Sequence, residues 1–350
     1  MLFEPLALRC GLVLPNRIAL APLTNFQSQL DGLLADAELA FLARRADGGY
    51  GLVATCAAYV SDDGKAWPGE LGVDRDACLP GLTRLAARIQ AGGARAFVQL
   101  FHGGARAELV DQPWSASAWT DGTLTPRAGT TDDIARAIDA FVDAAARSQA
   151  AGFDGVELHG AHGYLLSQFL SRTMNTRDDE WGGDLSHRAR LIREVTQRVR
   201  ARCGPTFCVG VRLSLEDFGQ AKGLDLDESL QVARWLADDG VDFIHVSLWD
   251  VARNTAKRPE VHALPLVRDV LPRDVAIFTA GKIWTHDDAE AVLAKGADVV
   301  ALGRSGILNP DWPRDVQVTR PPVTRVQLAE RAVSPVFADY LTKWKNFVLD

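Results

Sequence analysis

The chain has 350 residues, of which 47% are hydrophobic and 24% charged, the proportions of an ordinary globular protein. Its 38 Lys and Arg against 45 Asp and Glu give a net charge of −7. This balance argues against nucleic acid or an anionic membrane surface as the main partner. The five cysteines include no C-x-x-C pair, so a zinc ribbon or iron–sulfur cluster lacks its ligands. Their odd count predicts reduced thiols and a cytoplasmic protein. Neither a signal peptide nor a membrane span is expected.

Eight short apolar runs alternate with amphipathic ones along the chain. Each run lacks strict polar alternation, as expected for parallel strands buried on both faces. The runs are residues 17–23, 51–57, 96–101, 155–160, 207–214, 242–248, 276–281 and 298–304. Eight consecutive β–α units predict an α/β (β/α)8 TIM barrel, one domain over residues 1–350 with a helical tail from about 320. A doubly wound sheet is the alternative, but it favours G-x-G-x-x-G after the first strand, where this sequence reads APLTNF.

Two long loops interrupt the β–α period. Residues 103–131, rich in Gly, Pro, Ser and Thr, follow the third predicted strand, and residues 171–186 follow the fourth. Loops after barrel strands lie on the catalytic face. We therefore expect these two segments to cap a pocket.

Polar residues at the carboxyl ends of the predicted strands are candidate site residues. They are Thr24, Cys56, Gln99, His102, His159, His162, Tyr164, Arg212, His245, Ser247, Lys282 and Arg304. The set is rich in hydrogen-bond donors and has no cluster of carboxylates. Arg212 lies inside an apolar strand, and a buried cation needs an anionic partner. The pocket is therefore expected to bind an anionic ligand, unless Arg212 forms a structural ion pair with Glu157 of the adjacent strand.

Two Gly-cation pairs follow the last two predicted strands, Gly281-Lys282 and Gly303-Arg304. The loops after these strands are the usual phosphate-binding place in barrels, where backbone N–H groups and a cation hold the anion. Alternatively, each glycine only ends a strand and each cation is a solvated surface charge. The occurrence of both pairs at both expected strands favours the phosphate site.

The stretch ELHGAHGYLLSQFLS places His159, His162 and Tyr164 after the fourth strand. Three interpretations compete: a metal site, histidines satisfied in a packed corner, and two imidazole donors on one substrate oxygen with Tyr164 as proton donor. A metal would need converging carboxylates or a third histidine, for which only His245 is available. The two-donor clamp is the favoured interpretation.

These motifs resemble the old yellow enzyme family of FMN-dependent NAD(P)H oxidoreductases. The resemblance covers residues from about 5 to 315 and depends on PNRIALAPLTN, VQLFHGGARA, HGAHGYLLSQFLSRTMNTRDDEWGGD, VRLS, AGKI and LGR, in that order. The His-x-x-His-Gly-Tyr-Leu segment, followed by N-x-R-x-D and Gly-Gly, is its most specific part. The resemblance implies bound, non-covalent FMN, with NADH or NADPH as reductant and an electron-poor alkene, carrying a carbonyl or nitro group, as substrate.

The resemblance also implies a role for each matching position. The flavin ring would contact Pro22, Leu23, Thr24, Ala57, Gln99 and Arg212, and the FMN phosphate would lie at Gly281, Lys282, Gly303 and Arg304. His159 and His162 would bind the substrate oxygen, Phe26 would contact the substrate, and Tyr164 would donate the proton. Other reductases or a demethylase of the same family, a metal-dependent barrel hydrolase or lyase, and a non-catalytic flavoprotein are the alternatives. The tail is expected to pack on the barrel or on a neighbouring subunit of a homo-oligomer.

Some positions depart from the family pattern. Thr24 stands where one branch has a redox-tuning Cys, and Phe26 stands where that branch has a substrate-contacting Tyr. Trp181 replaces the usual Tyr before Gly-Gly, and residues 184–187 differ from the commoner loop. The histidine pair matches one branch and Thr24 another, so the sequence assigns no subgroup.

Overall fold

The structure, a computed structural model, describes residues 1–315 and 317–349 and is built around a closed parallel barrel. Its strands are β3 (Ile18–Leu20), β4 (Leu52–Tyr59), β6 (Arg95–Phe101), β9 (Gly155–Gly160), β10 (Cys208–Leu213), β11 (Phe243–Ser247), β12 (Ala276–Ala280) and β13 (Val299–Leu302). Each strand pairs in parallel with its neighbours, and β3 pairs with both β13 and β4, which closes the barrel. The predicted (β/α)8 fold is confirmed, with each strand within a few residues of its expected range.

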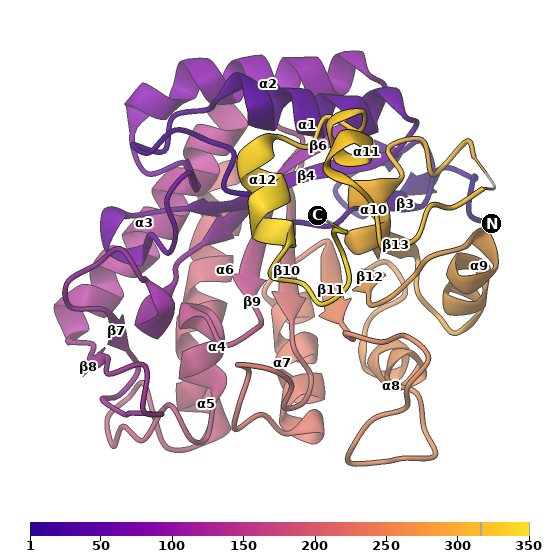
Figure 1. Cartoon of the computed structure of the whole chain (residues 1–350). Coiled ribbons are helices and arrows are strands. Elements are labelled where there is room, and N and C mark those ends of the chain that lie inside the picture. Colours follow the sequence, from indigo (N-terminus) through magenta and orange to yellow (C-terminus); the bar gives the residue numbers. More distant parts are fainter. Residues whose placement is uncertain (316, 350) are drawn as a thin grey trace.

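Helices surround the barrel (Figure 1). They are α1 (Asp36–Asp47), α2 (Leu79–Ala91), α3 (Thr131–Ala150), α6 (Arg190–Cys203), α7 (Leu226–Asp238), α8 (Ala263–Val270), α9 (His286–Ala294) and the short α10 (Arg304–Leu308). The longest, α3, begins with a capping box between Thr130 and Asp133. It buries Ile134, Ile138 and Phe141 at a spacing of four and three residues, which forms one apolar face against the sheet.

An N-terminal hairpin closes the amino end of the barrel. Its strands β1 (Leu6–Ala7) and β2 (Val13–Leu14) are antiparallel, and Leu8 and Leu14 pack against the aromatic residues inside the barrel. Phe243 and Phe278 stack there with ring centroids 4.1 Å apart. A side chain at Gly210 would collide with the ring of Phe243, so glycine is required at that point of β10. The interior of the barrel is therefore packed at this end, so a pocket inside the barrel opens at the other end.

The two predicted loops lie at the carboxyl end of the strands and contact each other. Short elements structure this end: β5 (Leu71–Gly72), β7 (Trp114–Ser115), β8 (Arg127–Ala128), α4 (Leu165–Leu170), α5 (Leu185–Arg188) and the 3-10 turns Asp62–Gly64, Asp76–Cys78 and Gly104–Arg106. Arg177 Nη1 donates to the carbonyl oxygens of Ala116 (2.9 Å) and Gly129 (2.6 Å) and so joins one loop to the other. Asn175 Nδ2 donates to the carbonyl of Trp181 at 2.8 Å. The N-x-R-x-D motif thus holds the loops together.

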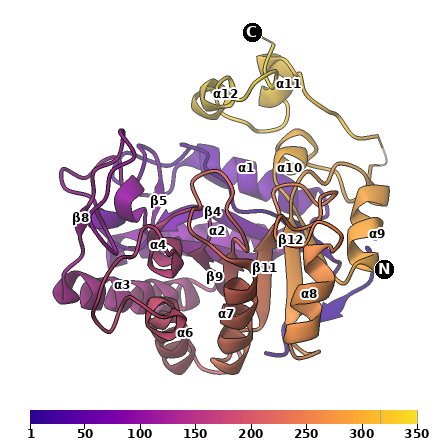
Figure 2. The same ribbon diagram turned by 90° about the horizontal axis from the view of Figure 1, so that it is seen from below.

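The chain after residue 320 forms α11 (Arg325–Ala329) and α12 (Pro335–Leu341). In Figure 1, α12 lies in front of the strands, and Figure 2 shows this segment on one side, outside the ring of helices. The Phe337 ring lies 5.4 Å from that of Phe41 on α1, and the Ser334 N–H donates to Gln27 Oε1 at 3.0 Å. Phe337 and Leu341 are fully buried, and each such side chain contributes about 1.5–3 kcal/mol to stability. Over the described residues, no helix is both long and apolar enough to cross a membrane.

Candidate active site

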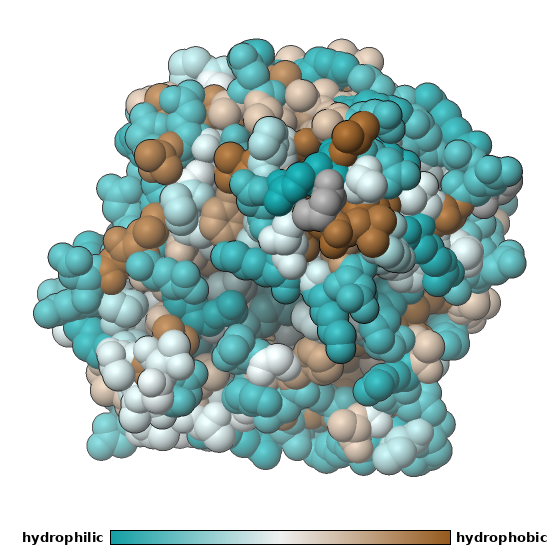
Figure 3. Space-filling view, viewed as in Figure 1, coloured by the Kyte–Doolittle hydropathy of each residue, from teal (hydrophilic) through white to brown (hydrophobic). Residues whose placement is uncertain are grey.

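The carboxyl ends of the eight strands meet around a hollow in the molecular surface. Figure 3 shows this hollow near the centre of the view, where Figure 1 places β9 and β10. A bulge in β4 between Ala54 and Ala57 shifts its register against β6, and bulges next to sites re-aim side chains. The Ala57 N–H donates to the carbonyl of Leu23 at 3.3 Å, which ties the loop that follows β3 to β4. Pro22, Leu23 and Thr24 therefore lie beside Ala57 at the mouth.

The structure brings His159, His162 and Tyr164 together at the end of β9. The ring centroid of His159 lies 5.0 Å from that of His162 and 5.0 Å from that of Tyr164, both in edge-to-face arrangements. His162 adopts a left-handed backbone with φ of 60°, which turns its ring back toward the barrel. Its Nε2 lies 2.7 Å from Ser247 Oγ at the end of β11.

Both histidines are neutral at ordinary pH. Burial, aided by the charge of Arg212, lowers the pKa of His159 to about 3 and the pKa of His162 well below its usual value. His159 Nδ1 accepts the Ala161 N–H at 3.3 Å, so the proton of the neutral ring is on Nε2. Two neutral imidazoles retain one N–H each, as an oxygen-binding pair requires. Within the described part of the chain, no third His, Cys, Asp or Glu ligand atom converges on this pair.

Arg106, which the strand-end analysis did not select, lies against Tyr164. Its guanidinium carbon is 4.2 Å from the centroid of the Tyr164 ring, and its Nη1 donates to the carbonyl of His162 at 2.9 Å. Burial raises the pKa of Tyr164, and the charge of Arg106 partly opposes that rise. Arg106 lies in the HGGARA segment after the third strand. Its charge, in a loop expected to cap the pocket, was the sequence feature that could have identified it.

A buried carboxylate lies beneath the mouth. Glu157 Oε1 accepts from Gln99 Nε2 at 2.6 Å, and Glu157 Oε2 lies 2.7 Å from His245 Nδ1. Burial opposes ionisation, but His245, Arg212 and Gln99 together hold the pKa of Glu157 below its usual value. Gln99 and His245 therefore anchor a negative charge inside the barrel, a role that the sequence did not indicate.

Arg212 has no direct ion pair with Glu157 among the residues that the structure describes. Its guanidinium donates to Ser247 Oγ at 3.3 Å, and its buried Nε has no hydrogen-bond partner within residues 1–315 and 317–349. Burial lowers the pKa of Arg212, although the charge of Glu157 opposes this effect. A buried, under-bonded guanidinium stabilises an acceptor or a negative charge placed beside it. The proposed structural ion pair is thus replaced by a charge that is free to bind a ligand.

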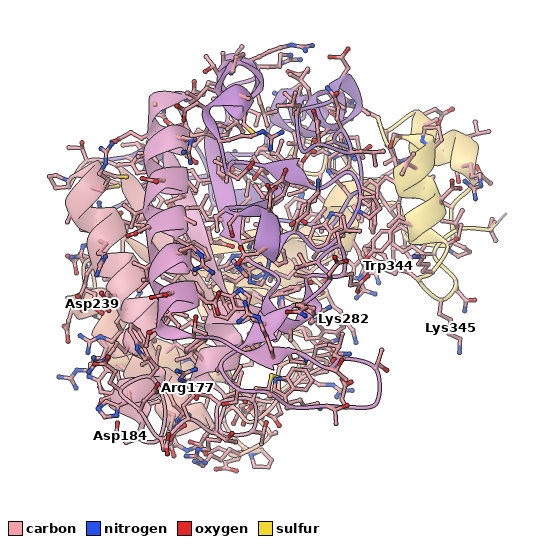
Figure 4. The ribbon with its side chains drawn as sticks, turned by 90° about the vertical axis from the view of Figure 1, so that its left-hand side faces the viewer. Arg177, Asp184, Asp239, Lys282, Trp344 and Lys345 are labelled. Carbon is pink, nitrogen blue, oxygen red and sulfur yellow. The ribbon has the colours of Figure 1, made fainter. Side chains whose placement is uncertain are left out.

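The two Gly-cation pairs differ in their surroundings. Lys282 Nζ pairs with Asp250 at 2.7 Å, so its charge is already balanced, and its backbone has φ of 54° after Gly281 with φ of 155°. Figure 4 shows Lys282 on the side of the barrel that faces the C-terminal segment with Trp344 and Lys345. The Arg304 side chain is exposed and has no hydrogen bond or ion pair to residues 1–315 or 317–349. A Cβ at Gly303 would meet a side-chain carbon of Leu23 at 3.7 Å, an ordinary van der Waals contact.

Aromatic side chains line one side of the mouth. The Phe26 ring lies 6.1 Å from Trp67 and 4.7 Å from Tyr340 of α12, and the Phe101 ring lies 4.5 Å from Tyr164. Phe26 has φ of 57°, a conformation that is uncommon for a bulky residue. Trp67 and Tyr340 were not predicted as site residues. For Tyr340 the reason is that nothing in the local sequence indicates that α12 folds back to this point.

These residues fit the FMN that the sequence resemblance implies. The ring would require a donor or cation at its polar edge, and Arg212 Nε is a buried donor without a partner there. The phosphate would require an uncompensated cation and backbone N–H groups at the last strand, and Arg304 at the start of α10 supplies both. Gly303 has no side chain, so a ligand can approach its backbone closely.

Comparisons with known proteins agree with this geometry. Residues 1–322 match the model of the NADH:flavin oxidoreductase / NADH oxidase family. The chain is 37% identical over 331 residues to the probable NADH-dependent flavin oxidoreductase YqiG of Bacillus subtilis. The match covers 91% of this chain and 88% of that protein. It is 34% identical to an NADPH dehydrogenase of Bacillus licheniformis, covering 89% of this chain and 93% of the relative.

Solved structures give the same result. The old yellow enzyme homologue from Zymomonas mobilis superposes with a TM-score of 0.81 at 28% identity, covering 97% of this chain and 99% of that one. Morphinone reductase in complex with tetrahydroNAD gives a TM-score of 0.80 at 27% identity, covering 100% and 98%. The resemblance drawn from the sequence is confirmed, and the chain belongs to the NADH:flavin oxidoreductase / NADH oxidase family, the family of the old yellow enzymes.

Proposed function

We propose that the chain is an FMN-dependent ene-reductase that uses NADH or NADPH to reduce electron-poor alkenes, the α,β-unsaturated carbonyl or nitro compounds. The observation that carries the proposal is the pair of neutral imidazoles of His159 and His162, with the Tyr164 ring 5.0 Å from His159. This constellation supplies two donors for one oxygen and a separate neutral acid.

The chain's residues would hold FMN in the hollow, with Pro22, Leu23, Thr24, Ala57, Gln99 and Arg212 around the ring and Gly281, Lys282, Gly303 and Arg304 around the phosphate. FMN would supply the hydride, having been reduced by the nicotinamide. Arg212 favours extra negative charge on a ligand edge because its guanidinium is buried without a bonded carboxylate. Among the cations at the phosphate end, Arg304 is the available one, since Lys282 pairs with Asp250.

The two histidines would act on the substrate oxygen. Ser247 can donate its single O–H to His162 Nε2 while it accepts from Arg212, which leaves the ring proton of His162 on Nδ1. His159 Nε2–H and His162 Nδ1–H then bind the carbonyl or nitro oxygen. These bonds strengthen as negative charge develops on that oxygen, so they stabilise the transition state more than the ground state.

Tyr164 would deliver the proton to the α-carbon of the alkene. Its pKa is raised by burial, so it is fully protonated at ordinary pH, and Arg106 over its ring stabilises the phenolate that remains. Phe26 and Trp67 form an apolar wall against which a planar substrate can pack.

An anaerobic titration tests this proposal. The purified protein is expected to be yellow, to be bleached by NADH or NADPH without air, and to be reoxidised by cyclohexenone. A colourless protein that cannot be reconstituted with FMN would contradict the proposal, and so would a bleached flavin that no enone or nitroalkene reoxidises. Titration with both nicotinamides and a panel of small enones also gives the preferred reductant.

Variants separate the two halves of the site. His159→Ala together with His162→Ala is expected to weaken the binding of phenols, which mimic the enolate, while FMN stays bound. Tyr164→Phe is expected to slow alkene reduction far more than flavin reduction. Loss of FMN from the double variant, or equal slowing of both steps by Tyr164→Phe, would mean that these roles are wrong.

A further inference from the structure

Two cysteines and an aspartate converge at the amino end of the barrel, opposite the hollow. The thiol sulfurs of Cys10 and Cys208 and a carboxylate oxygen of Asp242 all lie within 4.8 Å of one another. Cys208 and Asp242 are buried, whereas Cys10 is partly exposed. The three residues come from parts of the sequence separated by up to 232 positions (10 to 242), so only the fold brings them together.

Separate elements hold each of the three side chains. Cys10 lies in the turn of the N-terminal hairpin, which is closed by a bond from the Leu8 N–H to the Leu12 carbonyl (2.8 Å). Arg9 Nη1 fastens that turn to the carbonyl of Ala237 at 3.4 Å. Cys208 begins β10, and Asp242 directly precedes β11, the strand next to β10 in the sheet. The ligand atoms are therefore positioned before any ion binds.

Asp242 is oriented as a ligating carboxylate. Its Oδ2 accepts from Arg200 Nη2 (2.6 Å) and from the Val209 N–H (2.8 Å), which leaves Oδ1 for another contact. Outer contacts of this kind orient metal-binding carboxylates in other proteins. Two thiolates and one carboxylate carry three negative charges, and Arg200 offsets one of them. A divalent cation would bring this buried cluster to neutrality.

We propose that Cys10, Cys208 and Asp242 bind a thiophilic divalent cation of the zinc class. Two sulfur ligands and one oxygen ligand suit a tetrahedral ion, with water at the fourth position on the exposed side of Cys10. Ligand atoms around zinc lie about 3.5–4 Å apart, which the cluster reaches by small shifts. A disulfide between Cys10 and Cys208 would use the two sulfurs but give no role to the carboxylate oxygen of Asp242 that lies beside them. The ion would tie the N-terminal hairpin to the base of the barrel.

A metal titration of the tag-free, FMN-loaded protein, fully reduced and stripped of metal, tests the site. Cd²⁺ is expected to bind in a single equivalent with a thiolate-to-metal charge-transfer band in the ultraviolet difference spectrum, and an excess of Zn²⁺ is expected to compete with it for the same site. Zn²⁺ should raise the melting temperature in proportion to the logarithm of its free concentration. Cys10→Ser should weaken Cd²⁺ binding at least about a hundredfold, since loss of an outer partner alone costs 10–100-fold.

Controls make the outcome decisive. Cys78→Ser removes a cysteine outside the cluster and should bind Cd²⁺ like the parent chain. If Cys10→Ser folds poorly, Cys208→Ser tests the same site by removing the ligand on β10 of the barrel. Absence of stoichiometric Cd²⁺ uptake by the reduced parent chain would overturn the proposal. So would undiminished uptake by Cys10→Ser, or a Cys10–Cys208 disulfide in a protein whose reduced form binds no metal.

Discussion

The guanidinium of Arg106 lies 4.2 Å from the centroid of the Tyr164 ring and donates to the carbonyl of His162 at 2.9 Å, so one side chain contacts both halves of the proposed site. Arg106→Met should raise the pKa of Tyr164 further, because the cation opposes the effect of burial. A cation–π contact of this kind is worth about 1–2 kcal/mol, so its loss in Arg106→Met should slow proton transfer from Tyr164 about tenfold. Stopped-flow measurement of the rate at which cyclohexenone reoxidises the flavin checks this prediction.

Arg106→Lys keeps the charge and should recover part of the rate. The reduction of the flavin by NADPH should change little in either variant. A Met variant with unchanged reoxidation, or one impaired equally in both half-reactions, would exclude a role for Arg106 in tuning Tyr164.

Ser247 joins His162 to Arg212, since its Oγ lies 2.7 Å from His162 Nε2 and 3.3 Å from Arg212 Nη2. Ser247→Ala should let the His162 ring rotate and should leave His162 Nε2 and Arg212 Nη2 without this partner. The loss is expected to cost about 1–3 kcal/mol. Phenol binding to the oxidised enzyme should weaken about tenfold to a hundredfold, measured by the perturbation of the flavin spectrum. Ser186→Ala, at an exposed position of α5, is the matched control. Equal affinities in the two variants would show that Ser247 does not orient the ring.

The neutrality of the histidine pair predicts a flat pH profile. Because burial lowers the pKa of His159 to about 3 and that of His162 well below its usual value, neither ring gains a proton between mildly acidic and alkaline pH. The dissociation constant of a neutral enone should therefore stay constant across that range in the oxidised enzyme. An inflection near about 6.5, the ordinary histidine pKa, would mean that a ring titrates on binding.

The same shifts affect stability with a defined sign. A histidine whose folded pKa is depressed leaves the folded state neutral while the unfolded chain takes up a proton below about 6.5. The contribution of such a histidine to the free energy of unfolding is therefore complete above about 6.5 and is lost as the pH falls toward the pKa of the folded state.

The barrel was predictable from the sequence because parallel strands buried on both faces leave unmixed apolar runs at regular spacing. The mouth was predictable to the extent that its residues lie in the last residues of those strands, as His159 and Arg212 do, or directly after them, as His162 does. The interior carboxylate was harder to interpret. Glu157 lies within a strand, and its partners Gln99 and His245 come from strands that only the closed barrel brings together.

Residues outside the β–α register were not predictable. Tyr340 reaches Phe26 only because Phe337 is buried against α1, a contact between positions nearly 300 residues apart. Lys282 was predicted as a phosphate cation from its position, but Asp250, in the loop after the preceding strand, neutralises it. Charge pairing across loops depends on side-chain geometry that the chain order does not specify.

Glu38 on α1 is fully buried and accepts a hydrogen bond from Ser28. Burial raises its pKa, so the folded state keeps a proton that the unfolded chain releases above about 4.3. The stabilisation by this carboxyl is therefore complete at low pH and is lost as pH rises through the folded pKa. Glu38→Gln should flatten the fall in the free energy of unfolding between mildly acidic and alkaline pH, measured by urea denaturation. Asp36→Asn, which changes an exposed acid on the same helix, should leave the slope of the free energy of unfolding against pH unchanged. If the parent chain and both variants share one slope, Glu38 is ionised in the folded protein.

Tyr340 covers the aromatic side of the mouth, with its ring 4.7 Å from that of Phe26. Tyr340→Ala should expose Phe26 and Trp67 to water and remove about 0.5–1.5 kcal/mol of aromatic contact beyond the buried area. The KM for a small enone should rise several-fold, because the substrate loses a wall, whereas NADPH-driven flavin reduction at saturation and FMN affinity should stay the same. Val336→Ala, on the exposed face of the same helix, controls for altered stability of α12. If both variants raise KM equally, the effect comes from the helix as a whole; if neither does, α12 does not form part of the substrate site.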